Sequence, residues 1–171
     1  YVPDKANEQH YEVPPEFFEY VLGTNLKYSS GYWPKGIVSL DDSELAMLKL
    51  SAERAELNDG QSILELGCGW GSFTLFMAEK FPNSKITAVS NSKDQRKFIK
   101  NKCETKGLNN VSVITADMND FSIEESFDRV VSIEMFEHMR NYELLLERIS
   151  TWMKPKAKLF IHIFSHKDLV Y

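Results

Sequence analysis

The sequence predicts an α/β fold with a mostly parallel sheet that carries helices on both faces. Three observations lead to this prediction. Short, nearly continuous apolar strands alternate with helical segments from residue 62 onward. A glycine-rich turn joins the first of these strands to the next helix, and polar residues follow the later strands. The length of 171 residues is sufficient for one domain with a hydrophobic core.

The composition argues against several classes of protein. The chain has 25 acidic and 20 basic residues and a formal net charge of −5, which argues against binding to nucleic acid. No apolar run approaches the ~18 residues of a membrane span, and the N-terminal residues lack a signal-peptide pattern. Two cysteines, Cys68 and Cys103, provide neither a disulfide framework nor a cysteine-rich zinc site. We therefore expect a cytoplasmic protein without a transmembrane segment.

Residues 1–40 are expected to form an N-terminal arm. A short helix over its apolar patch would end at Gly23. The aromatic tract 27–34 has no clean period, so its rings could either pack on the core or line a pocket. Residues 41–171 form the expected main domain, a cofactor-binding Rossmann-like unit. Its pattern of strands and helices ends after a fifth strand, so we expect a domain that is incomplete at its C-terminus.

The main domain is expected to begin with a helix from Asp41 to Leu57, because Asp41 can cap it with Glu44 three residues later. Strands and helices then alternate. The expected strands are Ile63–Leu66, Ile86–Val89, Val111–Thr115, Asp128–Ile133 and Leu159–Phe164. The expected helices are Phe73–Phe81, Lys93–Lys106 and Tyr142–Met153, ended by Pro82, Gly107 and Pro155. The basic residues of the second of these helices are expected to face water.

The glycine-rich turn is the strongest local signal. Backbone amides at a helix N-terminus can approach a polar or anionic ligand where side chains are missing, as at Gly67, Gly69 and Gly71. The spacing G-x-G-x-G differs from the dinucleotide fingerprint, and Ser90-Asn91 stands where that fingerprint expects an acid. A nucleotide-like cofactor other than NAD is therefore predicted, and a turn that serves packing alone is the alternative.

Four segments together carry a family resemblance. They are Ile63–Gly71 (ILELGCGWG), His10–Pro14 (HYEVP), Tyr28–Trp33 (YSSGYW) and Ser132–Met139 (SIEMFEHM). The first resembles the cofactor motif of class I S-adenosylmethionine-dependent methyltransferases. The combination resembles the cyclopropane fatty acid synthase superfamily, which includes mycolic acid methyltransferases and plant alkaloid N-methyltransferases such as coclaurine N-methyltransferase.

The resemblance implies a Rossmann-like methyltransferase fold with S-adenosylmethionine at the carboxyl edge of the sheet. The glycines would lie near its amino acid moiety, and the arm would fold over its methionine part as a lid. Ser90, Asn91 and Gln95 match the tract that replaces the usual ribose acid, and Asp117-Met118 match the tract that flanks adenine. The cofactor-binding residues implied are Tyr28, Ser29, Glu65, Gly67, Gly69, Gly71, Ser90, Asn91, Gln95, Asp117, Met118 and Ile133.

The candidate catalytic residues follow the fourth and fifth strands. Glu134, Glu137 and His138 are side chains that could take a proton from an amine or favour its neutral form, which methyl transfer to nitrogen requires. A loop that only caps the next helix is the alternative for Glu137 and His138. His162 could line the same pocket or lie in the core. These residues match no recognised metal-ligand spacing, so no metal is expected.

Two kinds of acceptor remain open. The cyclopropane enzymes tend to have cysteine where this chain has Ser30 and glycine where it has Glu134, and both differences favour a small-molecule amine. Glu137 and His162 nevertheless match bicarbonate-site residues of the cyclopropane enzymes, so methylene transfer to an unsaturated lipid is the alternative. A cofactor-binding fragment without activity is a second alternative. The sequence predicts neither the identity of the acceptor nor the oligomeric state.

Overall fold

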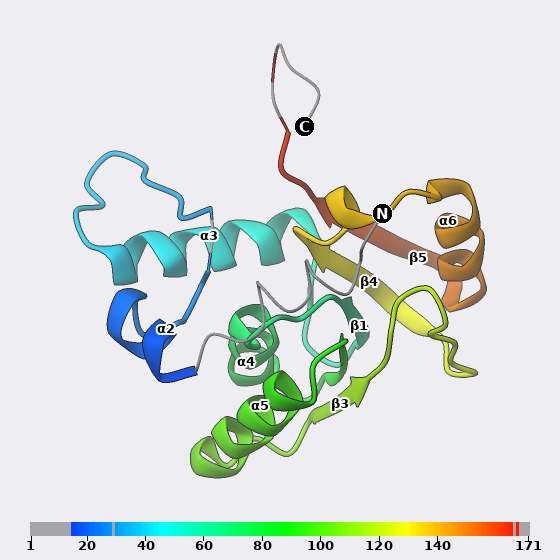
Figure 1. Cartoon of the computed structure of the whole chain (residues 1–171), viewed down its shortest axis with the longest axis horizontal. Coiled ribbons are helices and arrows are strands. Elements are labelled where there is room, and N and C mark those ends of the chain that lie inside the picture. Colours follow the sequence, from blue (N-terminus) through cyan, green and yellow to red (C-terminus); the bar gives the residue numbers. More distant parts are fainter. Residues whose placement is uncertain (1–14, 29, 166, 168–171) are drawn as a thin grey trace.

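The computed structural model describes residues 15–28, 30–165 and 167 (Figure 1). The described helices are α2 (Pro15–Val21), α3 (Leu40–Arg54), α4 (Ser72–Lys80), α5 (Lys93–Lys106), α6 (Tyr142–Thr151) and the 3₁₀ helix η1 (Phe136–His138). The strands are β1 (Ser62–Leu66), β2 (Lys85–Ser90), β3 (Val111–Thr115), β4 (Phe127–Ile133) and β5 (Met153–His162).

The strands form one five-stranded sheet in the order β3-β2-β1-β4-β5, and all four pairings are parallel. The predicted fold class is therefore confirmed. The chain moves outward from β1 to β3 in one direction and then crosses back to β4 on the other side of β1. Sheets with such a reversal bind ligands beyond the carboxyl ends of the strands on either side of it, here β1 and β4.

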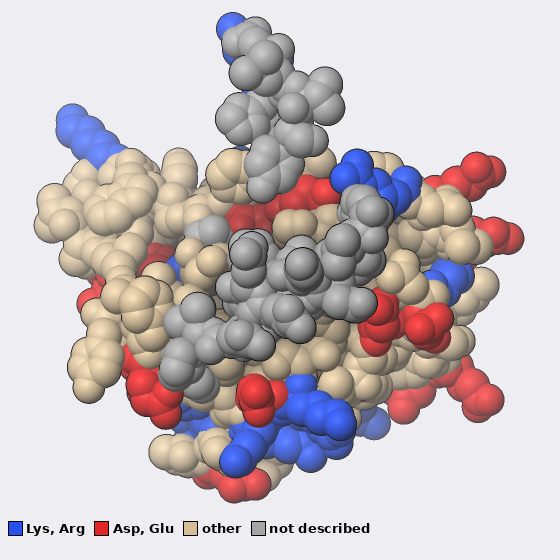
Figure 2. Space-filling view, viewed as in Figure 1, with Lys and Arg blue, Asp and Glu red and all other residues tan. Residues whose placement is uncertain are grey.

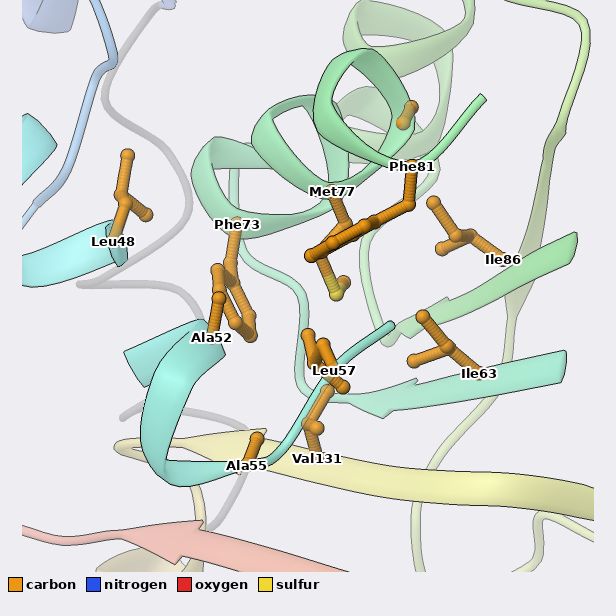
Figure 3. Close-up of a cluster of buried hydrophobic side chains, with 11 residues drawn as sticks. Leu48, Ala52, Ala55, Leu57, Ile63, Phe73, Met77, Phe81, Ile86 and Val131 are labelled. Carbon is orange, nitrogen blue, oxygen red and sulfur yellow. The ribbon is translucent and has the colours of Figure 1, made fainter. Parts of the chain in front are cut away.

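One face of the sheet packs on α3, α4 and α5. Figure 3 shows Ile63 of β1 and Val131 of β4 on the side of the sheet where Phe73 and Met77 of α4 lie, and Leu48 of α3 belongs to the same buried cluster. These five side chains are almost completely buried. The alternation of neighbouring strand residues between the two faces explains why a near-continuous apolar run forms each central strand.

The opposite face packs on α6. Leu64 and Val130 alternate with the residues of the first face and contact Leu145, Ile149 and Trp152 in a second buried cluster. The sheet is thus covered on both sides by helices, as predicted.

The helix cap expected at Asp41 is wrong. Ser39 caps α3, because its hydroxyl accepts the hydrogen bond from the Asp42 amide at 3.1 Å. Glu44 does not complete a capping box. Its carboxylate instead accepts hydrogen bonds from the amides of Gly23 and Asn25, at 2.8 Å and 3.1 Å. A residue that the sequence assigned to a local cap therefore ties the arm to α3.

The bounds expected around Pro155 are also wrong. The helix before it ends at Thr151, and Pro155 lies inside β5. β5 begins at Met153 and ends at His162, two residues before the predicted end. The strand lies at the edge of the described sheet and has a register irregularity opposite Phe127 and Arg129, a setting that tolerates proline.

The basic residues of α5 face outward, as predicted. Lys93, Arg96, Lys97, Lys100 and Lys106 are exposed, and Figure 2 shows Lys and Arg side chains gathered at the bottom of the view, over α5. Within the described part of the chain, no helix has the length and apolar character needed to cross a membrane.

Candidate functional site

The glycine turn between β1 and α4 is shaped by close packing at its two ends. A Cβ on Gly67 would lie 2.8 Å from Cβ of Met135, and one on Gly71 would lie 2.6 Å from Cγ1 of Ile99. Gly69, between them, has a φ of +53°, and no atom of the described residues lies within 4 Å of the position that a Cβ would occupy. The middle of the turn therefore presents backbone to open space at the N-terminus of α4.

Glu65 lies directly behind this turn on β1. It is buried and accepts a hydrogen bond from Oγ1 of Thr74 on α4 at 2.5 Å. Burial raises the pKa of Glu65 to about 8, against the smaller opposing effect of the Thr74 hydroxyl. Burial also raises the pKa of the Cys68 thiol, as does the charge of Glu65, and a thiol with a raised pKa is a poor nucleophile.

A row of aromatic rings connects the arm to the glycine turn. The ring of Trp70 lies 5.4 Å from that of Phe98 on α5 and 5.6 Å from that of Phe18 on α2. Phe18 in turn meets Tyr28 edge-on at 5.4 Å. Tyr28 is 63% exposed, whereas Phe18 and Trp70 are buried. Ser29, the other arm residue expected at the cofactor, lies outside the described residues.

The polar residues after β2 form a small internal network. The hydroxyl of Ser90 donates to Oε1 of Gln95 at 2.6 Å and accepts the amide hydrogen bond of Ser92 at 3.0 Å. Ser90 and Gln95 are buried, whereas Asn91 is exposed. This network gives the turn after β2 a fixed shape at the carboxyl edge.

The turn after β3 is held by α6. Asp117 accepts from the amide of Asn119 at 2.8 Å, so its carboxylate closes the turn, and Met118 is buried. Arg148 donates to the carbonyls of Met118 and Asn119, at 3.0 Å and 2.7 Å, and also to that of Phe121. One guanidinium therefore positions the segment that the sequence predicted to flank the adenine.

Glu134 lies at the centre of a polar cluster at the end of β4. Its carboxylate accepts a hydrogen bond from the hydroxyl of Ser30 and lies 4.0 Å from Nδ1 of His162. Its amide donates to the carbonyl of His162 at 2.7 Å. Ser30 and Glu134 both have left-handed backbones, with φ of 56° and 54°, a strained conformation that clusters at functional sites.

Lysine 27 belongs to the same cluster. Lys27 is 8% exposed, and burial lowers its pKa while the charges of Glu134 and Glu44 act in the opposite direction. Two segments more than 100 residues apart, the arm and the end of β4, thus meet through charged and polar side chains.

The remaining candidates occupy η1 and the end of β4. Glu137 is partly buried, and its Oε2 has no hydrogen-bond partner among the described residues. His138 is exposed at the end of η1. Ile133, the last residue of β4, packs against the core on the α3 and α4 side. The structure therefore places His162 beside Glu134 and leaves His138 on the surface, and His166 lies outside the described residues.

Sequence reasoning did not identify Lys27 and Glu44 as site residues. Lys27 lies in the aromatic tract 27–34, which has no clean period, and the position of Glu44 predicts part of a helix cap with Asp41. The sequence offers little evidence for either residue, because the partners of each lie far along the chain and residue spacing does not reveal such contacts. Ser30 was noted only as a replacement for cysteine, without its contact to Glu134.

Comparisons with known proteins identify the family. A model described as mycolic acid cyclopropane synthetase matches residues 3–169. The chain is 44% identical over 168 residues to (S)-coclaurine N-methyltransferase of Thalictrum flavum subsp. glaucum, covering 98% of this chain and 46% of that protein. It is 32% identical over 164 residues to the cyclopropane-fatty-acyl-phospholipid synthase of Escherichia coli (strain K12), covering 95% of this chain and 41% of that protein.

A solved structure shows the same fold. The crystal structure of coclaurine N-methyltransferase bound to N-methylheliamine and SAH superimposes with a TM-score of 0.89 at 45% identity, over 92% of this chain and 46% of that one. The chain thus spans less than half the length of these relatives. The family match covers almost all of the chain itself, and the resemblance noted in the sequence is confirmed: the chain belongs to the mycolic acid cyclopropane synthetase family.

Proposed function

We propose that this chain is part of an S-adenosylmethionine-dependent N-methyltransferase that acts on a small-molecule amine. The observation that carries the proposal is the carboxylate of Glu134, held by Ser30 beside His162 at the carboxyl end of β4. A carboxylate at this place suits a cationic amine. The 44% identity to a coclaurine N-methyltransferase supports the same reaction class.

The residues of the glycine turn fit the proposed cofactor. Gly69 presents its backbone to open space, and Oγ of Ser72, the first residue of α4, is buried with no hydrogen-bond partner among the described residues. A polar ligand at the turn would satisfy that hydroxyl. We further propose that Ser90, Asn91 and Gln95 hold the ribose.

Other parts of the carboxyl edge complete the proposed cofactor site. Asp117 and Met118 would flank the adenine, and Glu65 and Ile133 would also contribute to cofactor binding. The segment 1–40 would act as a lid over domain 41–171, with Tyr28 and Ser29 closing over the cofactor. The row of rings from Tyr28 to Trp70 supports this role, because it connects the arm to the glycine turn.

For methyl transfer, the protein must align the methyl donor with the amine and remove one proton from the ammonium form of the acceptor. The bound sulfonium would supply an electrophilic methyl group. Glu134 would hold the acceptor as its ammonium ion, and Glu137 and His138 would accept the proton that must leave before nitrogen can use its lone pair. The Oε2 atom of Glu137 has no hydrogen-bond partner in the described part of the chain, which supports a role in receiving or relaying that proton. His162 would fix the Glu134 carboxylate.

Methylene transfer to an unsaturated lipid is not favoured. Glu134 makes a hydrogen bond to Ser30, so both residues that differ from the cyclopropane pattern take part in one contact. The identity to the cyclopropane-fatty-acyl-phospholipid synthase is also lower, at 32%.

The cytoplasmic location stays a prediction, which cell fractionation tests.

Product NMR tests the proposal. Full-length protein is incubated with methyl-labelled S-adenosylmethionine and either coclaurine or an unsaturated phospholipid, with and without bicarbonate. We expect a labelled N-methyl group on the amine. A labelled cyclopropane carbon that requires bicarbonate would overturn the amine assignment, and cofactor binding without either product from full-length protein would favour a binding module.

A further inference from the structure

Arg148 holds the backbone of the turn after β3 at three points. Its guanidinium donates hydrogen bonds to the carbonyls of Met118 and Asn119, at 3.0 Å and 2.7 Å, and to the carbonyl of Phe121. Arginine suits this task, because its planar guanidinium carries five donors in a fixed arrangement. A side chain of α6 thus fixes part of the loop that joins β3 to β4.

Aromatic packing holds the guanidinium and the turn together. Arg148 lies over the ring of Trp152, with Cζ at 5.7 Å from the ring centroid. Trp152 is buried at the end of α6 and meets the ring of Phe121 edge-on at 5.0 Å. The backbone of Phe121 is therefore bonded to Arg148 while its side chain packs on Trp152, so this end of the turn is fixed twice.

The same turn presents the carboxylate of Asp117. The backbone carbonyl of Asp117 accepts the amide hydrogen bonds of Asp120 and Phe121, at 3.1 Å and 2.8 Å. Oδ1 of its carboxylate accepts from the amide and from Nδ2 of Asn119, at 2.8 Å and 2.9 Å. Asp117 is itself exposed. The direction of its carboxylate is thus set by residues that Arg148 holds in place.

A carboxylate in a fixed direction can distinguish two kinds of purine. An ionised carboxylate accepts hydrogen bonds and cannot donate them. Adenine offers the hydrogens of its exocyclic amino group, whereas hypoxanthine has a carbonyl oxygen at the same place. The carboxylate attracts the first group and repels the second, and a carboxylate that can turn away discriminates less. The preference for adenine therefore depends on how firmly the turn is held.

We propose that Arg148 is a positioning residue for the cofactor, which fixes the turn 117–121 so that Asp117 selects an aminopurine over an oxopurine. The inference rests on the proposed function, because that proposal places Asp117 beside the adenine. It adds that a side chain of α6, outside the residues proposed to touch the cofactor, sets the preference for the base.

Two ligands of the same shape measure this preference. S-Adenosylhomocysteine carries adenine, and S-inosylhomocysteine carries hypoxanthine in its place. Calorimetry on full-length protein gives the dissociation constant of each ligand. The ratio of the two constants, inosyl over adenosyl, is the base preference, and the loss of one hydrogen bond to a charged group should make it roughly tenfold or more in wild-type protein.

Arg148→Met keeps the length of the side chain and removes its donors. The ratio should then fall about fivefold, while kcat at saturating S-adenosylmethionine and the KM for coclaurine should stay within about twofold of wild type. Arg148→Lys keeps the charge with fewer donors in a less fixed arrangement, so its ratio should lie between those of the other two proteins.

Arg129 offers a matched control. It is partly buried like Arg148, and its guanidinium also donates to backbone carbonyls, those of Ala55 and Asp128, at 3.1 Å and 2.7 Å. These contacts lie near the beginning of β4, at the opposite edge of the sheet from the proposed cofactor site. Arg129→Met should therefore leave the ratio unchanged, although it also removes bonds from a guanidinium to carbonyls.

The failures are distinguishable. If full-length protein binds neither ligand, the proposed function fails and this inference fails with it. If wild-type protein binds both ligands equally, or Asp117→Asn leaves the preference intact, Asp117 does not read the base and the inference is overturned. If Asp117→Asn lowers the ratio but Arg148→Met lowers it no more than Arg129→Met does, only the role of Arg148 is overturned. Arg148→Lys decides the case if Arg148→Met does not fold: a lowered ratio supports the inference, and an unchanged or raised ratio overturns it.

Discussion

The hydroxyl of Ser30 donates a hydrogen bond to the carboxylate of Glu134, a residue 104 positions further along the chain. This contact joins the arm to the end of β4, and both residues adopt left-handed backbones to make it. The arm is thus part of the proposed acceptor site as well as a candidate lid over the cofactor.

Removing this hydrogen bond should weaken acceptor use. Ser30→Ala frees one side of the Glu134 carboxylate, and a hydrogen bond to a charged group contributes about 1.5–3 kcal/mol, so kcat/KM for the amine should fall roughly tenfold or more. The KM for the cofactor should change little. Steady-state kinetics on full-length protein measure both, with Ser112→Ala on exposed β3 surface as the control. Equal losses for both substrates would argue against a specific role.

The aromatic row should couple the arm to the glycine turn. Phe18 is 5% exposed and contacts both Tyr28 and Trp70, so Phe18→Ala should weaken binding of S-adenosylhomocysteine by about tenfold, a loss of ~1.4 kcal/mol. Phe17 is 50% exposed, and Phe17→Ala is the matched control. Calorimetry on the folded chain measures the affinity. The same affinity in both variants would show that the arm does not reach the cofactor.

Gly69 should be essential for cofactor binding but not for folding. A methyl group there would meet no atom of the described residues within 4 Å, so Gly69→Ala should cost only the ~1–2 kcal/mol of a left-handed non-glycine residue while blocking ligand approach. Gly107→Ala introduces the same change at a φ of +68°, at the end of α5. We expect both variants to lose similar stability and only Gly69→Ala to lose S-adenosylhomocysteine in calorimetry. Unchanged affinity in folded Gly69→Ala would contradict the assignment of the turn.

Glu65 should make stability depend on pH. Its pKa is about 8 when folded and near the ordinary value of 4.5 when unfolded, so unfolding releases a proton between these pH values. The stabilising difference is present in full below pH ~4.5 and is lost as pH rises toward ~8, at up to ~1.4 kcal/mol per pH unit. Relative to Glu65→Gln, the wild-type free energy of unfolding should fall over this range, as urea titrations at several pH values would measure. A difference that is independent of pH would show that Glu65 is ionised in the folded chain.

The sequence was sufficient for the fold because its signals are local. Apolar strands, the glycine turn and the helix stop at Gly107 each act within a few residues, and the sheet followed from their alternation. The helix end predicted from Pro155 was wrong, because proline often ends a helix but here lies inside the strand β5. Only the pairing of β5 at one edge of the described sheet shows why proline fits there.

The candidate residues at the strand ends could be predicted from the sequence, but the noncovalent contacts between distant segments could not. Glu134 and His162 follow from the rule that ligands bind beyond the carboxyl ends of parallel strands. Lys27 and Glu44 come close to these residues through contacts between the arm, α3 and β4, which no periodicity encodes. The exposed position of His138 likewise depends on how η1 leaves the sheet.

The central claim is that Glu134 and His138 serve an amine acceptor, and a pH series of kcat/KM for coclaurine tests it most directly. If His138 takes the proton or orients the acceptor, His138→Ala should lower turnover by roughly two to four orders of magnitude with cofactor affinity little changed. Glu134→Gln should mainly raise the KM for the amine, and this defect should ease at higher pH as the amine loses its charge. Values of kcat/KM within about threefold of wild type in both variants, at every pH, would contradict the account.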